Sequence, residues 1–287
     1  MSRFITVIDA GPLTTVQDVG RPGWAHLGVP RSGALDMPAV ALANRLVGNP
    51  DHAAVLETTL GGVTFRVSTA MTVAVTGAVG VVSVDGRPVA FGEPVTANRG
   101  ATVMIGRASV AVRSYVAVAG GLDVTRVLGS RSTDILSGLG PDPLSPGDEL
   151  PVGEPFGEPR GVDVTVVHRQ PQTPVTLRVI PGPRRDWFTD QAPETLGGSS
   201  YVVSPDSNRI GLRLSGSSLE RSNQGELPSE GIVLGAIQVP ASGQPLVFLN
   251  DHPTTGGYPV IGVVVPEDLV FCAQMRPGDE VRFRLLA

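Results

Sequence analysis

Turn-forming residues interrupt this chain so often that no long helix fits into most of it. Its 36 glycines and 26 prolines make up about a fifth of the 287 residues, against roughly 12% in average proteins. Between them lie short apolar runs rich in valine, such as residues 63–67, 71–75 and 102–105. Runs of this length, each closed by turn residues, predict a mainly β fold with many short strands.

Two short helices are expected among these strands. Asp36 can cap a helix that ends at Gly48, with a stripe formed by Ala39, Leu42, Ala43, Leu46 and Val47. A second helix is predicted from Pro266 to Met275, with acidic residues in its first turn. The polar, glycine-containing stretch from Thr14 to Asp36 is expected to be a long functional loop.

The two halves of the chain repeat several short motifs in the same order. The clearest example is the Pro-Gly-Asp-Glu sequence at residues 146–149 and again at 277–280, in which each Pro-Gly pair fits a type II turn. The repeats predict an internal duplication of one β domain, with inserted strands in the first copy. The expected domains are residues 1–160 and 175–287, joined by a connecting segment, 161–174, in which Val162–Val167 favours one strand.

The absence of lysine excludes several kinds of chemistry, because all 22 basic residues are arginine. A Walker A phosphate loop, a Schiff base and the Ser-Ser-Lys triad of amidases each need a lysine. The four histidines do not have the spacing of metal ligands, and Cys272 is the single cysteine. No metal or prosthetic group is therefore expected in this chain.

Charge and hydropathy limit the partners of the chain. Its net charge is −5 and it has no basic stripe, so nucleic acid and anionic membrane surfaces are poor candidates. No apolar run approaches a membrane span, and Phe4–Ile8 is too short for a secretory signal. A cytoplasmic protein that acts on a small molecule is the expectation.

Residues 249–259 form the segment with the highest density of potentially reactive side chains. An apolar run ends at Leu249, and Asp251, His252, Thr254 and Thr255 follow within a few residues. Loops after buried strands commonly carry chemistry. An equally good explanation from the pattern alone is a hairpin loop whose side chains bond to their own backbone.

The motifs also resemble a known family in their order along nearly the whole chain. The matching segments are residues 11–21, 29–36, 43–49, 56–60, 118–123, 128–133, 235–240 and 251–259. They are similar to the KipA family, also called the 5-oxoprolinase C subunit or the allophanate hydrolase subunit 2 domain. One departure is Asn208, where the family usually has aspartate.

The resemblance implies two cyclophilin-like β-barrel domains and, as partner, a KipI-like B subunit. Together with a LamB/YcsF-like A subunit, the family opens 5-oxo-L-proline to L-glutamate, using ATP with Mg²⁺ at the level of the complex. The chain is thus expected to be a subunit of a hydrolase complex and to be inactive alone. Two alternatives are the carboxyltransferase component of a biotin-dependent urea carboxylase and a non-catalytic regulator that binds a KipI-like kinase inhibitor.

The expected site lies where the His252 loop meets residues 17–36. His252 and Asp251 are expected to transfer protons, and Arg21 and Arg209 to bind anions. The full set of residues expected to bind substrate or anions is Gln17, Asp18, Arg21, Ser32, Asp36, Glu57, Arg209, Gln238, Thr254, Thr255 and Tyr258.

Overall fold

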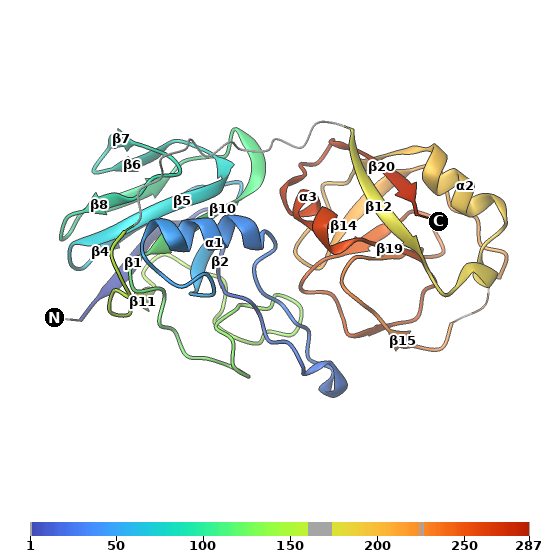
Figure 1. The fold of residues 1–287 in the computed structure, drawn as a ribbon, viewed down its shortest axis with the longest axis horizontal. Coiled ribbons are helices and arrows are strands. Elements are labelled where there is room, and N and C mark those ends of the chain that lie inside the picture. Colours follow the sequence, from blue (N-terminus) through green and yellow to red (C-terminus); the bar gives the residue numbers. More distant parts are fainter. Residues whose placement is uncertain (1, 160–173, 224, 226, 287) are drawn as a thin grey trace. The chain divides into compact units, whose positions relative to one another are not determined.

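The computed structural model describes residues 2–159, 174–223, 225 and 227–286 of two compact units (Figure 1). Unit 1 contains residues 1–21, 32–134 and 138–170, and unit 2 contains residues 22–31, 135–137 and 171–287. Segments 22–31 and 135–137 thus join the second unit, although the sequence analysis placed them in the first domain. Residues 161–173 of the predicted connecting segment, with the strand expected at Val162–Val167, lie outside the described residues.

Unit 1 contains two antiparallel sheets. The six-stranded sheet has the order β11 (Glu149–Pro151), β1 (Phe4–Ala10), β4 (Val63–Val67), β9 (Thr102–Ile105), β6 (Val82–Val84) and β7 (Arg87–Val89). The five-stranded sheet has the order β2 (Leu13–Gln17), β3 (Val55–Thr59), β10 (Val110–Val118), β5 (Met71–Val79) and β8 (Val95–Ala97). The predicted Asp85-Gly86 hairpin joins β6 and β7, with positive φ at both residues, as a type I′ turn requires.

Apolar side chains between the two sheets form the main core of unit 1. Ile5 and Phe65 of the six-stranded sheet and Leu56 and Val116 of the five-stranded sheet are all 0% exposed. Helix α1 (Met37–Leu46) packs on the other face of the five-stranded sheet, through Val40, Ala43 and Leu46 among others. Unit 1 is therefore built of three layers.

Helix α1 begins and ends where the sequence predicted. The Asp36 side chain accepts a hydrogen bond from the Ala39 backbone N–H at 3.0 Å, and Gly48 has a φ of +78° beyond the last turn. The buried stripe is slightly rotated from the predicted one, since Val40 is buried and Ala39 and Leu42 are only partly buried.

Unit 2 is a closed seven-stranded barrel. Around the barrel the strands follow the order β12 (Val175–Pro181), β19 (Val260–Val264), β16 (Ala236–Gln238), β17 (Leu246–Phe248), β14 (Gly211–Gly216), β13 (Ser200–Val203) and β20 (Glu280–Leu285). All neighbours are antiparallel except β12 and β20, which are parallel and complete the closure. A separate two-stranded sheet pairs β15 (Glu230–Gly231) with β18 (Thr255–Gly256).

Short helices complete unit 2. They are α2 (Gln191–Gly198), α3 (Leu269–Gln274) and the 3-10 turns η1 (Ala25–Leu27), η2 (Arg185–Trp187) and η3 (Pro266–Asp268). The helix predicted at 266–275 is thus η3 followed by α3. Among the described residues, no helix has the length and apolar character needed to cross a membrane.

The repeated Pro-Gly-Asp-Glu motif has the same geometry in both units. Gly147 and Gly278 have φ values of +97° and +93°. In each turn the aspartate carboxylate accepts a hydrogen bond from the backbone three residues earlier, at 2.8 Å for Asp148 and 2.7 Å for Asp279. Each turn also exchanges backbone hydrogen bonds with one neighbouring strand residue, Val7 or Val203. The type II prediction for Gly is confirmed, and the mainly β fold with a few short helices is confirmed as well. Of the two expected barrels, unit 2 is a closed barrel, whereas the described strands of unit 1 form two sheets.

The predicted loop from Thr14 to Asp36 is partly wrong. Its first four residues belong to β2, which pairs in register with β3 from Leu13–Thr59 to Gln17–Val55. Thr14, Thr15 and Gln17 are buried, so their polar character concealed a strand that lies inside the unit. Pairing with β3, which is distant in the sequence, makes these residues a strand in spite of their polar side chains.

Candidate functional site

Arg209 and Asp251 form a buried ion pair in unit 2. The Nε of Arg209 lies 2.9 Å from Oδ2 of Asp251, and its Nη2 lies 3.0 Å from Oδ1. The two side chains are 1% and 0% exposed. An arginine that binds a carboxylate with two parallel hydrogen bonds is committed to that partner. The structure therefore shows these two side chains bound to each other, while the anion binding predicted for Arg209 and the proton transfer predicted for Asp251 stay predictions.

The ion pair holds the turn that follows β17. The backbone N–H of Asp251 donates to the carbonyl of Arg209 at 3.1 Å, and that of His252 donates to Leu249 at 3.0 Å. Oδ2 of Asp251 also accepts from the backbone N–H of Ile135 at 3.2 Å. Asp251 thus joins three segments of unit 2, and it fixes the backbone from which His252 projects.

His252 has a defined tautomer. Its Nδ1 lies 2.7 Å from the carbonyl oxygen of Pro253. Since a carbonyl oxygen only accepts, Nδ1 carries a proton and donates it to this bond. The ring is 7% exposed and lies at a centroid distance of 5.9 Å from the Phe248 ring. A neutral imidazole held in this way is suited to accept a proton at Nε2.

The loop that contains His252 is held at its C-terminal end by β15 and by Gln238. Thr255 and Gly256 form β18, opposite Gly231 and Glu230 of β15. Nε2 of Gln238 donates to the carbonyl of Tyr258 at 3.1 Å. Gly256 allows this close approach, because a Cβ there would lie 2.9 Å from Nε2 of Gln238.

The predicted positioning residues differ in exposure. The remaining candidates of the loop are Thr254, which is partly buried, and Thr255 and Tyr258, which are exposed. Unit 2 thus brings together all seven of its predicted residues around one loop.

Asp18 is the hydrogen-bonding centre of a cluster in unit 1. Its Oδ1 accepts from the hydroxyl of Ser132 at 2.7 Å and from the Ser130 hydroxyl, and its Oδ2 accepts from the backbone N–H of Arg131 at 2.7 Å. The Gly20 N–H adds a fourth bond, at 2.8 Å. A carboxylate with four donors is fully satisfied. Asp18 therefore fixes the loop at residues 130–132.

Three more candidates of unit 1 contact the same segment. The Gln17 amide at 3.0 Å and the Ser32 hydroxyl at 2.8 Å both donate to the carbonyl of Thr133. The Arg21 guanidinium donates to the carbonyl of Ser132. Ser32 also has a φ of +53°, a conformation that is strained for a residue with a side chain. These residues converge on residues 130–133, which belong to a segment that resembles the family (128–133) but were not predicted as site residues.

Glu57 and Asp36 meet at a second cluster of unit 1, around Tyr115. Oε2 of Glu57 accepts from the Leu35 N–H at 3.1 Å, and Oε1 lies 3.6 Å from Nε of Arg113. The Tyr115 hydroxyl accepts from the Asp36 N–H at 2.9 Å and bonds to Glu57. Burial, followed by the charges of Glu57 and Asp36, raises the pKa of Tyr115 well above its ordinary value. Arg113 and Tyr115 were missed, because each lies in a strand pattern with no local polar signal.

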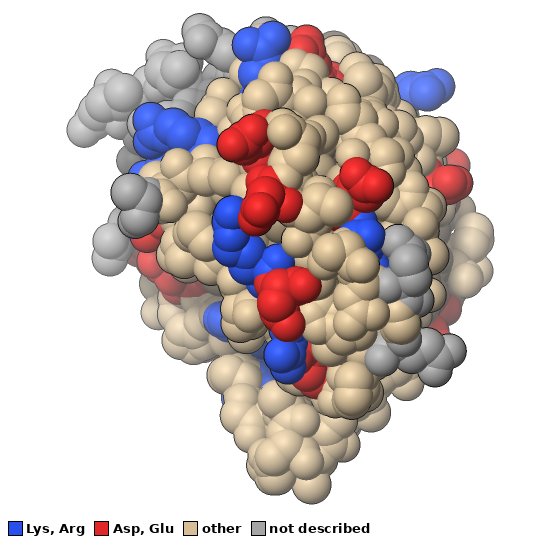
Figure 2. Space-filling view, turned by 90° about the vertical axis from the view of Figure 1, so that its right-hand side faces the viewer, with Lys and Arg blue, Asp and Glu red and all other residues tan. Residues whose placement is uncertain are grey.

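Charges of both signs are interspersed on the face of the molecule in Figure 2, where arginines lie beside aspartates and glutamates. In the part of the chain that the structure describes, no three His, Cys, Asp or Glu side chains lie close enough to hold a metal ion. Whether the His252 loop and residues 17–36 form one cleft stays a prediction, since residues 17–21 and 32–36 belong to unit 1 and the His252 loop belongs to unit 2.

Comparison with known proteins places the chain in a family. The family model of the carboxyltransferase domain, subdomain A and B, matches residues 27–285. The chain therefore belongs to the carboxyltransferase domain family. The resemblance found in the motifs is confirmed.

Two curated relatives match almost from end to end. The 5-oxoprolinase C subunit of Escherichia coli is 39% identical over 98% of this chain and 90% of its own length. The protein of the same name from Haemophilus influenzae is 30% identical over 99% of this chain and 92% of its own. This chain is thus similar to whole 5-oxoprolinase C subunits.

A solved structure shares the fold as part of a larger enzyme. The crystal structure of the urea amidolyase of K. lactis matches 99% of this chain with a TM-score of 0.92 and 29% identity, and the match covers 19% of that longer chain. Here the likeness is to one portion of a multidomain protein.

Proposed function

We propose that this chain is the C subunit of an ATP-dependent 5-oxoprolinase, which opens 5-oxo-L-proline to L-glutamate together with a KipI-like and a LamB/YcsF-like subunit. The proposal rests on the share of each relative's length that matches this chain. The match accounts for nine-tenths of the Escherichia coli 5-oxoprolinase C subunit, but for 16% of the Lachancea kluyveri urea amidolyase. A match over nine-tenths of a subunit supports the function of that subunit.

His252 is the proposed proton-transfer residue in this chain. Opening the lactam requires water to add to the ring carbonyl carbon, the C–N bond to break and the nitrogen to gain a proton. An imidazole protonated at Nδ1 can accept the proton of water at Nε2 and return it to the leaving nitrogen. ATP, a substrate of the whole complex, transfers its γ-phosphoryl group to the lactam oxygen and leaves as ADP. A second water then releases this group as inorganic phosphate after the ring has opened, which leaves glutamate.

The other predicted residues support this loop. Arg209 and Asp251 hold the backbone at His252, and Gln238 holds the end of the loop at Tyr258. Thr254 and Thr255 lie between these two fixed points and are the proposed contacts for the substrate. Because no group of the described side chains fits a metal, the proposal assigns no Mg²⁺ ligand to this chain.

The second candidate function is carboxyl transfer from biotin, which the family name and the urea amidolyase fold favour. One assay distinguishes the 5-oxoprolinase from the carboxyltransferase. The chain is co-expressed with its KipI-like and LamB/YcsF-like subunits in the cytosol, the compartment we propose for the complex. The purified complex is given ATP with 5-oxoproline, or carboxybiotin with urea.

Release of glutamate from 5-oxoproline, without transfer to urea, supports the 5-oxoprolinase. Carboxyl transfer to urea without glutamate release would replace it with the second candidate. If neither reaction occurs although the chain binds the KipI-like subunit, the complex is a non-catalytic regulator.

A further inference from the structure

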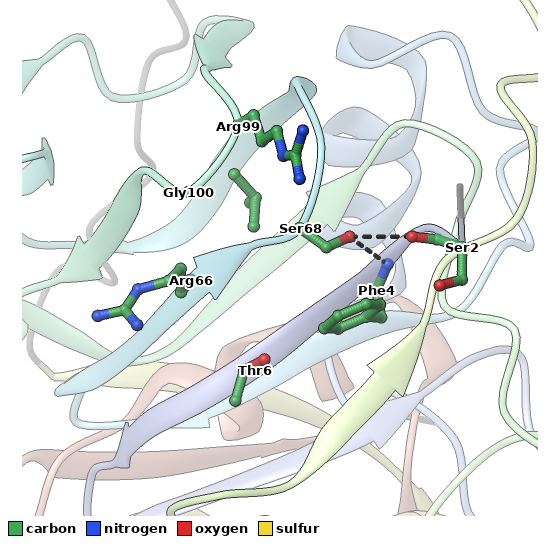
Figure 3. A pocket seen from close by; sticks show the side chains of 8 residues that line it. Ser2, Phe4, Thr6, Arg66, Ser68, Arg99 and Gly100 are labelled. Carbon is green, nitrogen blue, oxygen red and sulfur yellow. Dashed lines mark hydrogen bonds between the residues drawn. The ribbon is translucent and has the colours of Figure 1, made fainter.

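A pocket of about 420 Å³ lies in unit 1, at one end of the six-stranded sheet and apart from all the residues discussed above. Its lining is formed by Ser2, Phe4, Thr6, Arg66, Val67, Ser68, Arg99 and Gly100. Figure 3 shows Arg66 and Arg99 on different segments, with their guanidinium groups turned to opposite sides, so both side chains have to turn toward a ligand that they share. The lining includes two arginines and no acidic residue, although the whole chain has a net charge of −5.

The strand register brings Arg66 to the pocket. Thr6 of β1 and Arg66 of β4 are direct antiparallel partners, so their side chains stand on the same face of the sheet. The next residues along the strands are joined by two further bonds, in which the Phe4 N–H donates to the Ser68 hydroxyl at 2.9 Å and the Ser68 N–H donates to the Phe4 carbonyl at 3.0 Å. The sheet thus provides a rigid floor.

A tight turn brings Arg99 to the same place. The Ala101 N–H donates to the Asn98 carbonyl at 2.9 Å, and Gly100 has a φ of +78° at the third position, as in a type II turn. The Gly100 N–H donates to the Val67 carbonyl at 2.8 Å, which fixes the turn against the end of β4. Arg99 therefore projects from a held backbone, next to Ser68.

The Arg66 and Arg99 guanidinium groups have no bonding partner among the described residues. Among the residues that the structure describes, the Arg66 and Arg99 side chains make no hydrogen bond or ion pair, and both are exposed. By register, two acids lie two strands away from Arg66. Glu149 opposes Thr6, and the Asp85 carboxylate accepts from the backbone of Thr102, which is the other partner of Arg66; neither acid lines the pocket. This differs from Arg21 and Arg209, which are buried and bonded.

We propose that this pocket binds the phosphoryl group of a small molecule through Arg66 and Arg99. A single guanidinium suffices to bind a carboxylate with two hydrogen bonds, whereas a phosphate has three terminal oxygens and up to two charges, which suit two arginines and the Thr6 hydroxyl. The volume lies in the range of small-molecule sites, roughly 300–1,000 Å³, and the Phe4 ring offers an apolar wall to the rest of the ligand. This site goes beyond the proposed function and does not depend on it.

Calorimetric titration of the full chain at low ionic strength tests the proposal, with inorganic phosphate and ADP as probes. We expect one site for phosphate, and a rise of about tenfold in the dissociation constant for Arg66→Gln and for Arg99→Gln. Similar affinities for phosphate and ADP would identify free phosphate as the ligand, while clearly tighter binding of ADP would identify a nucleotide. Both results support a phosphoryl site.

Arg87→Gln is the matched control, since Arg87 is an exposed arginine of β7 in the same sheet but outside the pocket. It removes the same charge and should leave binding unchanged, and thermal melting should show all three variants folded. Three results would overturn the proposal. They are no phosphate binding by the wild type, equal loss in Arg87→Gln, and binding of L-glutamate as tight as that of phosphate.

Discussion

The Arg209 guanidinium and the Asp251 carboxylate face each other through two parallel hydrogen bonds of 2.9 and 3.0 Å, with almost no solvent access. Asp251 immediately precedes His252, so this pair sets the position of the proposed proton-transfer residue. The pair thus supports the backbone of the neighbouring histidine.

Loss of one partner of this pair should strongly destabilise unit 2. Arg209→Gln leaves the Asp251 carboxylate buried without its counter-charge, which typically costs about 3–5 kcal/mol. Thermal or urea unfolding followed by circular dichroism measures the loss. The control is Arg185→Gln, because Arg185 and Asp190 form an exposed pair at 3.7 Å and such pairs contribute little. Equal stability of Arg209→Gln and wild type would contradict the structural role of the pair.

Tyr115→Phe should destabilise unit 1 by about 1–3 kcal/mol, since it removes the buried hydroxyl that accepts from the Asp36 N–H and bonds to Glu57. The pKa of Tyr115 is raised in the folded state, so its contribution is fully present below the unfolded pKa, about 10, and is lost as the pH rises above it. The difference in unfolding free energy between wild type and variant should therefore shrink above pH 10. A difference that stays constant across this pH range would show that the hydroxyl is not held protonated by the fold.

Asp268 should contribute a pH dependence at the acidic end. Its burial raises its pKa, but hydrogen bonds from the Arg178 backbone at 2.7 Å and from its guanidinium outweigh burial, and the net pKa is lowered. A lowered pKa stabilises the fold above the unfolded value, about 3.9, and this stabilisation is lost as the pH falls through the folded value.

Asp268→Asn should therefore lower the Tm at pH 7 and converge with wild type as the pH falls below 4. The effect should be modest, because the Arg178 side chain is 39% exposed and partly screened by solvent. A Tm difference that widens on acidification would contradict this assignment.

His252→Gln should abolish most of the activity of the complex without unfolding the chain. Glutamine keeps a hydrogen-bonding side chain of similar size but does not titrate, and loss of a general acid or base typically costs about 10²–10⁴-fold in rate. His52→Gln is the control, since His52 is exposed in a turn of unit 1. Near-normal turnover by a folded His252→Gln variant would leave the histidine as a loop residue only.

Much of the fold was predictable, because its signals are local. The Asp36 cap and Gly48 define α1 by backbone chemistry that depends on few neighbours, and Asp85-Gly86 defines its hairpin in the same way. The repeated Pro-Gly-Asp-Glu turns were readable because the type II geometry requires glycine at a fixed position. The strands at 63–67 and 102–105 have the predicted bounds.

The roles of the site residues were not predictable from sequence, because they depend on distant partners. Asp18 looks like a free acid until the hydroxyls of Ser130 and Ser132, more than a hundred residues later, bond to its carboxylate. Arg209 looks like an anion ligand until Asp251 is placed beside it. Thr14 and Thr15 looked like loop residues, because only the pairing with β3 identifies them as a strand.

The most direct test of the proposed function is glutamate release by the reconstituted complex of three subunits, with each of them omitted in turn. The account predicts that glutamate and ADP form together from 5-oxoproline and ATP, and that omission of this chain abolishes both. This chain alone should be inactive, since it has no Walker A lysine. Undiminished ATP-dependent glutamate release by a complex that lacks this chain would contradict its place in the enzyme.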